Sequence, residues 1–264
     1  MERICVCGLG KVGQPILRLL RERGFEAVGY DRDTAKSDAS IGEVVAHSSA
    51  AIFIVQTPSL SDGSFSNEYL LSALRLFHDC APENYLYIVT STTTPGSCDE
   101  FRRNVGDNLV YKPEFIRLEH VDADLRAPSF ILIGEHNREA GDRAEAIYRQ
   151  VVGRGQISVQ RMSLIEAELA KITLNCALTM KISLANQLHL VANKLGADSQ
   201  RIMAAVGCDP RIGPEYLTPG WPYAGPCLPR DNRMFQFVAH RARVKASLSI
   251  GADEINREME NLLV

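Results

Sequence analysis

Three glycines near the N-terminus are spaced as in a turn that binds phosphate. Gly8-x-Gly10-x-x-Gly13 directly follows the apolar run 3–7 and precedes a segment with helical periodicity. The first glycine permits a tight turn, the second lets a pyrophosphate approach the backbone, and the third lets the helix pack on the strand. The amides and positive dipole of a helix N-terminus attract phosphate. We expect five residues of this turn to contact a dinucleotide: Gly8, Gly10, Lys11, Val12 and Gly13.

An acidic residue ends the second predicted strand. Asp31 lies eighteen residues after Gly13, where a carboxylate accepts hydroxyls of the adenine-side ribose and repels a 2′-phosphate. Arg32 follows it and slightly weakens that preference. The pattern predicts NAD rather than NADP as the cofactor, bound in part by Asp31 and Arg32. The alternative is a glycine turn in an α/β protein that binds no nucleotide.

The first half of the chain alternates short apolar runs with helical patterns. Continuous apolar strands separated by helices are typical of a parallel sheet covered on both faces. We therefore expect an α/β fold with a Rossmann-type doubly wound sheet. The predicted strands are Arg3–Cys7, Glu26–Tyr30, Ala51–Gln56, Tyr85–Thr90, Leu109–Lys112 and Phe130–Gly134. The predicted helices between them include Gln14–Arg23, Asn67–Cys80 and Arg138–Val151.

The pattern changes near residue 160. Apolar residues recur at helical spacing from Met162 to about Leu195 without glycine or proline, and Gly196 follows as a C-cap. At 1.5 Å per residue such a helix is roughly 50 Å long, so it predicts the spine of an all-helical domain and a dimer contact. We predict an NAD-binding domain over residues 1–155 and a helical domain over 156–264.

Composition argues against several classes of partner. The chain has 264 residues, of which 45% are hydrophobic and 23% charged, with a formal net charge of −3. These values are typical of a water-soluble globular protein and favour neither a nucleic-acid partner nor a membrane. We find no signal-peptide pattern and no apolar run of membrane-spanning length. Seven cysteines without repeated CxxC pairs predict reduced thiols in a cytoplasmic protein, with no disulfide and no metal site.

Six further segments occur in an order that points to one family. They are Gln56-Thr57-Pro58, Ser91-Thr92-Thr93-Thr94-Pro95-Gly96, Pro113-Glu114-Phe115, Glu168-Leu169-Ala170-Lys171 with Asn175, Asp209-Pro210-Arg211-Ile212-Gly213 and Tyr223-Ala224-Gly225-Pro226-Cys227-Leu228-Pro229-Arg230-Asp231. In this order and spacing they resemble the UDP-glucose/GDP-mannose dehydrogenase family. The match covers the first two domains of that family. It implies an enzyme that oxidises a nucleotide-sugar primary alcohol to a carboxylate with two NAD, through an enzyme thioester.

The resemblance assigns catalytic roles to six residues. Cys227 matches the nucleophile of the family's cysteine loop, and Lys171 with Asn175 matches the pair that stabilises the oxyanion. Asp231 and Thr92 match residues that position water. Glu114 matches a glutamate that handles protons during thioester hydrolysis. The resemblance also places Thr57, Pro58 and Thr92 at the cofactor.

The chemistry explains why these residue types are needed. A thiolate at Cys227 traps the aldehyde as a thiohemiacetal, and the second oxidation gives a thioester that water can cleave. Each tetrahedral species carries an oxyanion, and one preorganised donor is typically worth about 3 kcal/mol. Lys171 and Asn175 are four residues apart on the predicted helix, so they share one face. The lysine also favours the thiolate form of a nearby cysteine.

We expect the substrate to be a primary alcohol, either a nucleotide-sugar or a smaller anionic molecule, bound by residues from both halves of the chain. Arg211 matches an arginine that reaches a neighbouring subunit's substrate, which implies a homodimer. The expected substrate contacts are Lys112, Glu114, Phe115, Arg117, Lys171, Asn175, Arg211, Tyr223 and Gly225.

The sequence departs from the family pattern in three ways. The chain stops near the end of the helical domain, so a substrate smaller than a nucleotide-sugar becomes plausible. Lys112 stands in place of an asparagine, and Leu118 in place of a second glutamate, so we hypothesise that Lys112 or Arg117 contacts an anionic group of the substrate. Pro226 replaces a serine before Cys227, where it removes a backbone N–H and stiffens the loop.

Two other functions remain open from the sequence. A two-electron β-hydroxyacid-type dehydrogenase also uses a Lys-x-x-x-Asn pair, with Lys171 as the acid/base, and needs neither Cys227 nor Asp231. A non-catalytic NAD-binding module would need none of these side chains. Each residue taken alone could have a purely structural role. Cys227 could be a small buried residue, and Lys171 a solvated lysine on a helix.

Overall fold

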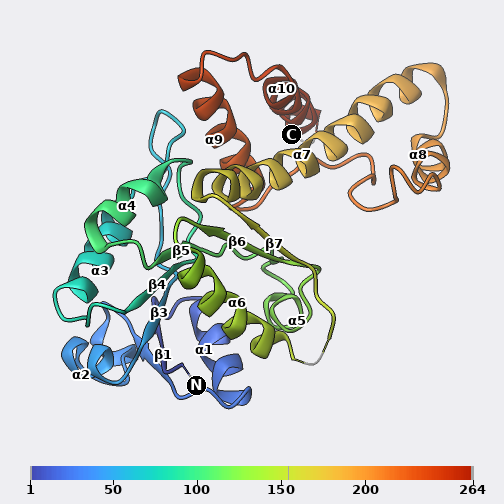
Figure 1. The fold of residues 1–264 in the computed structure, drawn as a ribbon. Helices are drawn as coiled ribbons and strands as arrows, with labels where there is room; N and C mark the ends of the chain where they lie inside the picture. Colours follow the sequence, from blue (N-terminus) through green and yellow to red (C-terminus); the bar gives the residue numbers. More distant parts are fainter. Residues whose placement is uncertain (1, 154, 263–264) are drawn as a thin grey trace. The chain divides into compact units, whose positions relative to one another are not determined.

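The computed structural model describes residues 2–153 and 155–262, which form two compact units. The first unit comprises residues up to 58 and residues 65–171, and the second comprises residues 59–64 and 172–264. The short segment 59–64 therefore belongs to the second unit, although the sequence of the first unit surrounds it. Figure 1 labels the helices and strands of both units, and we describe each unit by itself.

A sheet of seven strands forms the centre of the described part of the first unit. Its strands lie in the order β2-β1-β3-β4-β5-β6-β7. The six strands predicted from the sequence are all present, and β7 is an addition that the sequence pattern does not predict. The bounds are β1 Ile4–Cys7, β2 Ala27–Tyr30, β3 Ala50–Phe53, β4 Leu86–Val89, β5 Leu109–Tyr111, β6 Ile131–Glu135 and β7 Val159–Met162.

One edge of this sheet departs from the expected parallel arrangement. Strands β1 to β5 are parallel to their neighbours, but β6 is antiparallel to β5, with Val110 opposite Glu135 and Tyr111 opposite Gly134. The described sheet is therefore mostly parallel, as expected, with one antiparallel pair at this edge. The connection between β5 and β6, residues 112–130, contains the helix Val121–Arg126 and is long enough for either direction, so its length does not decide the pairing. The longer crossover through α6 then leads to β7, which is parallel to β6.

Helices cover both faces of the sheet, as a doubly wound fold requires (Figure 1). Buried side chains of α1, α5 and α6 join one apolar core, and those of α2, α3 and α4 join the other. The structure thus confirms the Rossmann-type fold and the three predicted helices. The bounds are α1 Gly13–Glu22, the 3-10 turn η1 Thr34–Lys36, α2 Ile41–Ala46, α3 Glu68–His78, α4 Ser97–Val105, α5 Val121–Arg126 and α6 Arg138–Val152.

Alternation along the strands divides the apolar side chains between two cores. Ile4 and Val6 of β1 lie in the core beneath α1, α5 and α6, while Cys5 and Cys7 lie in the opposite core. Successive side chains of a strand point to opposite faces, so one short run serves both layers. Both cysteines are buried and free, and burial raises the pKa of each thiol.

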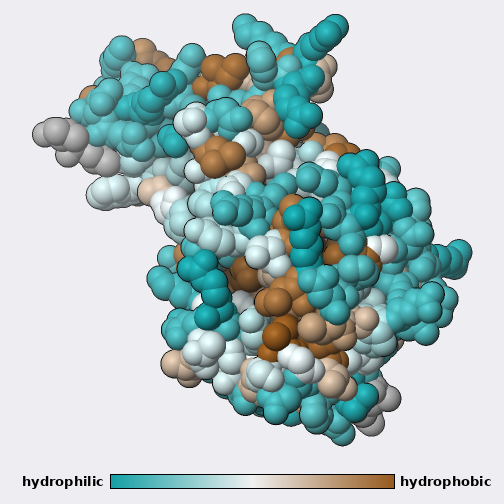
Figure 2. Space-filling model, turned by 90° about the vertical axis from the view of Figure 1, so that its left-hand side faces the viewer, coloured by the Kyte–Doolittle hydropathy of each residue, from teal (hydrophilic) through white to brown (hydrophobic). Residues whose placement is uncertain are grey.

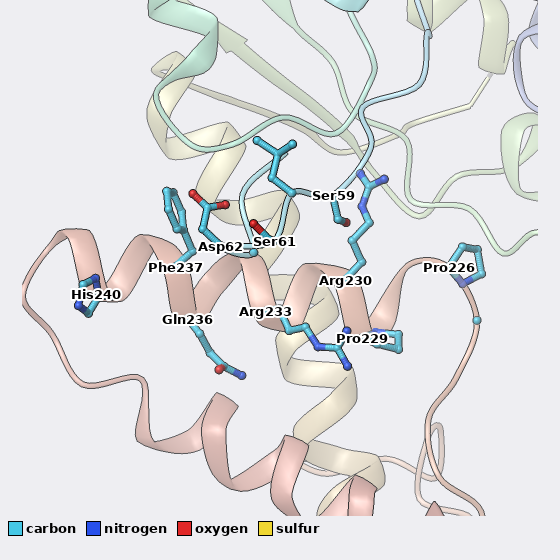
Figure 3. Close-up of a pocket in the computed structure, with 13 residues that line it drawn as sticks. Ser59, Ser61, Asp62, Pro226, Pro229, Arg230, Arg233, Gln236, Phe237 and His240 are labelled. Atoms are coloured by element: carbon cyan, nitrogen blue, oxygen red, sulfur yellow. The ribbon is translucent and has the colours of Figure 1, made fainter. Parts of the chain in front are cut away.

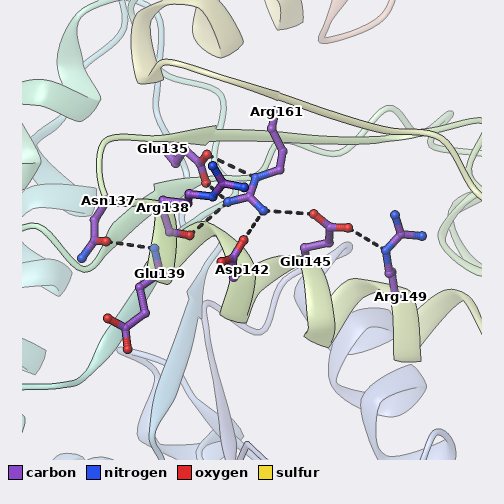
Figure 4. Close-up of polar contacts among 8 residues, drawn as sticks. All are labelled: Glu135, Asn137, Arg138, Glu139, Asp142, Glu145, Arg149 and Arg161. Atoms are coloured by element: carbon purple, nitrogen blue, oxygen red, sulfur yellow. Dashed lines mark hydrogen bonds and ion pairs between the residues drawn. The ribbon is translucent and has the colours of Figure 1, made fainter.

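A cluster of charges ties the reversed edge of the sheet together (Figure 4). Arg161 on β7 donates from Nη2 to Glu135 Oε2 on β6 at 2.6 Å, and it also contacts Asp142 and Glu145 on α6. These hydrogen bonds, that to Glu135 foremost, raise the pKa of Arg161. Gly141 makes room for the pair, because a Cβ there would lie 1.4 Å from Glu135 Oε2. The cluster therefore stabilises β6, β7 and α6 as one block.

The second unit is helical. Helix α7, Leu164–Leu195, begins in the first unit and continues into the second, which confirms the long helix predicted from Met162 to about Leu195. The backbone N–H of Ser163 donates to Glu166 Oε2 at 2.8 Å before its first turn, and Gly196 follows its last residue with φ +68°. The remaining helices are α8 Ser199–Gly207, α9 Leu228–Arg241 and α10 Ser247–Leu262.

The segment 59–64 forms a closed turn against α9. Within it, Leu60 N–H donates to the carbonyl of Ser64 at 2.7 Å, and Gly63 N–H donates to the carbonyl of Leu60 at 3.1 Å. Gly63 has φ +89°, and a Cβ there would lie 3.2 Å from the carbonyl oxygen of Arg233 on α9. The turn and the helix are thus in close backbone contact within the second unit.

Hydrophilic side chains predominate on the face of the protein drawn in Figure 2, with hydrophobic side chains gathered in patches among them. Among residues 2–153 and 155–262, no helix is long and apolar enough to cross a membrane. The same residues contain no group of three or more His, Cys, Asp or Glu side chains placed to hold a metal ion.

Candidate functional site

The glycine turn has the geometry that its spacing predicts. Gly8 has φ +99°, and a Cβ there would lie 2.6 Å from the carbonyl oxygen of Ile54. A Cβ on Gly13 would lie 1.8 Å from the carbonyl oxygen of Gly8, so helix α1 packs directly on the turn. A Cβ on Gly10 would meet no atom of the described residues within 4 Å. Gly8 and Gly13 are therefore required by packing, whereas Gly10 leaves the backbone open for a ligand.

The carboxylate of Asp31 lies beside this turn. Asp31 Oδ2 accepts the backbone N–H of Leu9 at 2.7 Å, and Oδ1 accepts the N–H of Asp33 at 2.9 Å. These bonds fix the acid at the end of β2, next to the glycine turn at the end of β1. Arg32 points to the ring of Tyr69, with its guanidinium carbon 5.6 Å from the ring centroid. Lys11 is exposed on the turn. The open backbone at Gly10 and the neighbouring carboxylate fit a dinucleotide.

The segments that follow β3 and β4 are joined by hydroxyl groups. Thr57 Oγ1 donates to the carbonyl of Thr92 at 2.7 Å, and Ser91 Oγ donates to the carbonyl of Val55 at 2.6 Å. The carboxyl ends of β1 to β4 therefore bring the glycine turn, Asp31, Thr57 and Thr92 to one edge of the sheet, where ligands bind in open α/β folds. Pro58 is exposed beside them.

Glu168 on the first turns of α7 anchors that helix to the segment after β4. Its carboxylate accepts Thr93 Oγ1 at 2.9 Å, Gly96 N–H at 2.7 Å and Cys98 N–H at 2.9 Å. The last two amides belong to the N-terminus of α4, which a carboxylate stabilises. Burial raises the pKa of Glu168, although these hydrogen bonds act in the opposite direction. Sequence reasoning gave this residue no role; an acid at a core-facing position of the helix pattern is the signal that could have identified it.

Lys171 lies one turn further along α7 and contacts the segment after β5. Its Nζ donates to the backbone carbonyl of Glu114 at 2.8 Å and lies 4.8 Å from the centroid of the Phe115 ring. Lys171 is 8% exposed. The structure thus brings together three of the predicted site residues, Lys171, Glu114 and Phe115.

The two basic residues near Glu114 differ in their surroundings. Lys112 is buried, with its Nζ 2.5 Å from Glu114 Oε1. Arg117 has a side chain that is 60% exposed and pairs with Asp124, Nη2 to Oδ1, at 2.7 Å. The hypothesis that one of them contacts an anionic group of the substrate stays a prediction.

Asn175, on the part of α7 that belongs to the second unit, contacts Asp231. Asn175 Nδ2 donates to Asp231 Oδ2 at 2.6 Å, and both side chains are buried. Asp231 lies in the first turn of α9, and its N–H donates to the carbonyl of Cys227 at 2.9 Å. Cys227 is the N-cap residue of α9 and is exposed. A thiolate at a helix N-terminus is stabilised by the dipole, so this position favours a reactive cysteine.

A buried hydrogen-bond network holds the segment that leads to Cys227. Tyr223 N–H donates to Asn256 Oδ1 at 2.6 Å, and Asn256 Nδ2 donates back to the carbonyl of Tyr223 at 3.0 Å. The Tyr223 hydroxyl donates to Asp253, which also accepts Asn232 Nδ2 at 2.9 Å. Burial, followed by the bond to Asp253, raises the pKa of Tyr223. Tyr223 thus lies inside the unit, while Gly225 is exposed with φ +80°.

The residues of this network other than Tyr223 were missed by sequence reasoning. Asn232 on α9 and Asp253 and Asn256 on α10 are polar residues within amphipathic helices, where the pattern alone does not distinguish a solvent-facing amide from a buried one. Asn232 and Asn256 are buried in the structure. By contrast, Arg211 has a side chain that is 86% exposed and pairs with Asp209, Nη2 to Oδ2, at 2.7 Å.

An open groove of about 1040 Å³ lies on the second unit (Figure 3). The segment 59–64 forms one side and α9 forms the other. Arg230 extends from α9 toward Ser59, and Arg233 lies one turn further along the helix (Figure 3). Pro226 lines the groove immediately before Cys227. In this view the Arg233 side chain points to the opposite side of α9 from that of Arg230, and the carboxylate of Asp62 also lines the groove.

Two domain models of one family match the chain. The NAD-binding domain of the UDP-glucose/GDP-mannose dehydrogenase family matches residues 35–152, and the central domain of that family matches residues 165–258. A putative UDP-glucose 6-dehydrogenase of Bacillus subtilis is 30% identical over 96% of this chain and 67% of its own length. The UDP-glucose 6-dehydrogenase of Rickettsia bellii is 26% identical over 95% of this chain and 58% of its own length. The chain thus spans about three-fifths to two-thirds of the length of these relatives.

Solved structures show the same likeness. A UDP-glucose dehydrogenase from the hyperthermophilic archaeon Pyrobaculum islandicum superposes with a TM-score of 0.88 at 26% identity, over 98% of this chain and 68% of that chain. The 3-hydroxyisobutyrate dehydrogenase of Mycobacterium tuberculosis has a TM-score of 0.73 at 17% identity, over 98% and 93% of the two chains, which is a likeness of fold alone. The domain models and the Bacillus relative together decide the family: the chain belongs to the UDP-glucose/GDP-mannose dehydrogenases and carries their NAD-binding and central domains.

Proposed function

We propose that the protein is an NAD-dependent dehydrogenase that oxidises a primary alcohol to a carboxylate through a thioester at Cys227. The observation that carries this proposal is the position of Cys227, exposed at the N-terminus of α9, four residues before the Asp231 carboxylate that contacts Asn175. The substrate that we propose is a nucleotide-sugar or a smaller anionic alcohol. The relatives named UDP-glucose 6-dehydrogenase support this class.

The cofactor half of the proposed site is the edge of the sheet where β1 to β4 end. Gly8, Gly10 and Gly13 shape the turn, and the amides of α1 face a bound pyrophosphate. Asp31 and Arg32 bind the adenine-side ribose. The other proposed NAD contacts are Lys11, Val12, Thr57, Pro58 and Thr92. When bound, NAD supplies the hydride acceptor for each of the two oxidations.

The residues of the chain carry the remaining steps. The thiolate of Cys227 attacks the carbonyl carbon of the aldehyde, which forms a C–S bond and a thiohemiacetal oxyanion. Lys171 and Asn175, one turn apart on α7, donate to that oxyanion and lower the barrier by about 3 kcal/mol per donor. After the second oxidation, water attacks the thioester. Thr92 and Asp231 orient this water, Glu114 takes its proton, and the Cys227 thiolate leaves.

Four of the other predicted substrate contacts have a role in this proposal. Phe115, Tyr223 and Gly225 shape the site, and Arg211 reaches the substrate of a second copy, so the working form is a homodimer. The seven cysteines are all free within the described residues, which suits a reducing compartment such as the cytoplasm.

Stoichiometry tests the proposal directly. Purified protein is incubated with NAD and a panel of UDP-sugars, GDP-sugars and small anionic alcohols, and the NADH and carboxylate formed are counted. Two NADH per carboxylate, with a covalent adduct at Cys227 in a quenched reaction, are the expected results. One NADH per product and an active Cys227→Ala variant would instead identify a two-electron dehydrogenase. No turnover with any alcohol or aldehyde would favour a non-catalytic NAD-binding module.

A further inference from the structure

Lys112 is a charged residue inside an apolar core. It directly follows β5, and its N–H continues the strand pairing by donating to the carbonyl of Val89 at 2.8 Å. Val110, two residues earlier, points to the core beneath α1 and α6, so the side chain of Lys112 follows it to that face. There it lines a small cavity of about 20 Å³ together with Ile16, Leu20, Leu125 and Ile131. The residue is only 5% exposed.

Two groups face the buried ammonium. Glu114 Oε1 lies 2.5 Å from Lys112 Nζ, with a side chain that is itself only 10% exposed. The ring of Tyr148 on α6 presents its face to the same ammonium, 4.0 Å from the ring centroid. An opposite charge and an aromatic face are the partners that favour a cation away from water. Burial lowers the pKa of Lys112, and Glu114 opposes that shift.

Glu114 contacts both lysines, through different atoms. Its carboxylate contacts Lys112, and its backbone carbonyl accepts Lys171 Nζ at 2.8 Å. Loss of the Lys112 contact would free the Glu114 side chain, and a shift of that residue would move the carbonyl that Lys171 contacts. The path from Tyr148 through Lys112 and Glu114 to Lys171 lies within the first unit.

We propose that Lys112 is a positioning residue, whose buried ammonium holds the Glu114 carboxylate and thereby fixes the backbone carbonyl that orients Lys171. The inference deepens the proposed function, because Lys171 and Glu114 act in that reaction. It gives Lys112 a role through Glu114, whereas the hypothesis drawn from the sequence gives it direct contact with the substrate. The two roles predict different kinetics.

The first experiment separates kcat from KM. Lys112→Met keeps the length of the side chain and removes its charge, and Lys112→Arg keeps the charge. We expect Lys112→Met to lower kcat about 10- to 100-fold, with KM for the alcohol within about twofold of the wild-type value. Lys112→Arg should recover part of the loss. A raised KM with unchanged kcat would show substrate contact and overturn the inference, and so would a variant with wild-type kcat and KM.

A second experiment does not depend on catalysis. The pKa of Lys112 is measured by NMR of the labelled lysine Nζ and Cε nuclei in the wild type and in Glu114→Gln. Since Glu114 raises the pKa of the buried lysine, its loss should lower that pKa further. An unchanged pKa would overturn the inference. If the lysine pKa falls as expected but no alcohol is oxidised, the ion pair stands and the proposed function fails.

A double-mutant cycle checks that the two side chains act as a pair. Lys112→Met leaves a buried carboxylate without its cation, so we expect its Tm to fall by about 10 °C. Lys112→Met combined with Glu114→Gln should be more stable than the sum of the single losses predicts. Lys36→Met is the matched control, because Lys36 pairs with Asp33 at 3.1 Å on the surface and its loss should shift Tm by about 2 °C or less. Additive losses would contradict the pairing.

Discussion

The cofactor turn of the first unit and the cysteine segment of the second both hold a loop in place, but by different means. At the turn, backbone atoms meet directly: a Cβ on Gly8 or Gly13 would lie within 2.6 Å of a carbonyl oxygen. The segment before Cys227 is held by a side chain instead. The Asn256 side chain forms hydrogen bonds with both the N–H and the carbonyl of Tyr223. A loop held by backbone packing can be recognised in the sequence from its glycine pattern. A loop held by amide side chains leaves no such pattern.

The largest effect should follow from changing the thiol itself. Cys227→Ser should lower the rate of carboxylate formation about a thousandfold or more, because an alcohol is a far weaker nucleophile than a thiolate. Product carboxylate is measured by mass spectrometry alongside NADH. Cys208→Ser is the control, since Cys208 is also exposed but its Sγ donates to the carbonyl of Ala204. Equal loss in both variants would argue against a special role for Cys227.

Alanine substitutions at two glycines test the backbone side of the comparison. Gly13→Ala should destabilise the protein by about 3 kcal/mol or more, because its Cβ would lie 1.8 Å from the Gly8 carbonyl oxygen. Gly10→Ala should change stability by less than about 0.5 kcal/mol and weaken NAD binding about tenfold. Urea unfolding and calorimetric NAD titration measure the two quantities. The distinction fails if the Gly13 variant is as stable as the Gly10 variant.

Removing the Asn256 amide tests whether side chains hold the segment before Cys227. Asn256→Ala leaves the buried N–H and carbonyl of Tyr223 without this partner, and should cost about 2 kcal/mol of stability. It should also change the rate at which iodoacetamide modifies Cys227, because the segment before it is released. Asn193→Ala, at an exposed position on α7, should change stability by less than about 0.5 kcal/mol. Similar losses in both would show that the network does not hold the segment.

The smallest effect should be a change of pH dependence in Glu168→Gln. Burial raises the pKa of Glu168 in the folded protein above the usual 4.5, so the folded state takes up its proton more readily than the unfolded state. The stability contributed by this group is therefore greatest at low pH and falls as pH rises from 4.5 through the folded-state pKa. The unfolding free energy of the wild type minus that of Glu168→Gln should therefore decrease as the pH rises through this range. A constant difference from pH 4 to pH 8 would contradict it.

Much of the first unit could be predicted because its signals are local. The glycine spacing, Asp31 and the apolar runs identify the turn, the cofactor edge and six strands. The reversal of β6 depends on how a connection with one short helix, Val121–Arg126, closes on the sheet, which no local pattern encodes. Strand β7 has mixed residues, with Arg161 held by acids from α6, so it lacks the apolar run that marks the other strands.

The site could be predicted in part. The sequence pairs Lys171 with Asn175 by helical spacing and marks the Cys227 segment. It does not show that Glu168 anchors α7, which depends on Thr93 and the start of α4, or that Lys112 lies in the core, which depends on side chains of α1 and α6. A lysine after an apolar strand is typical of solvent exposure, and only the packing of Tyr148 against it reveals otherwise.

The membership of residues 59–64 in the second unit has a consequence for engineering. The chain crosses between the units at three junctions, after residues 58, 64 and 171. A chimera made by a single cut near residue 171 would pair a foreign α9 with the native turn at Gly63, whose backbone contacts that of Arg233. Exchange of the helical half between relatives therefore requires grafting two pieces of sequence together, the hexapeptide and the long C-terminal segment.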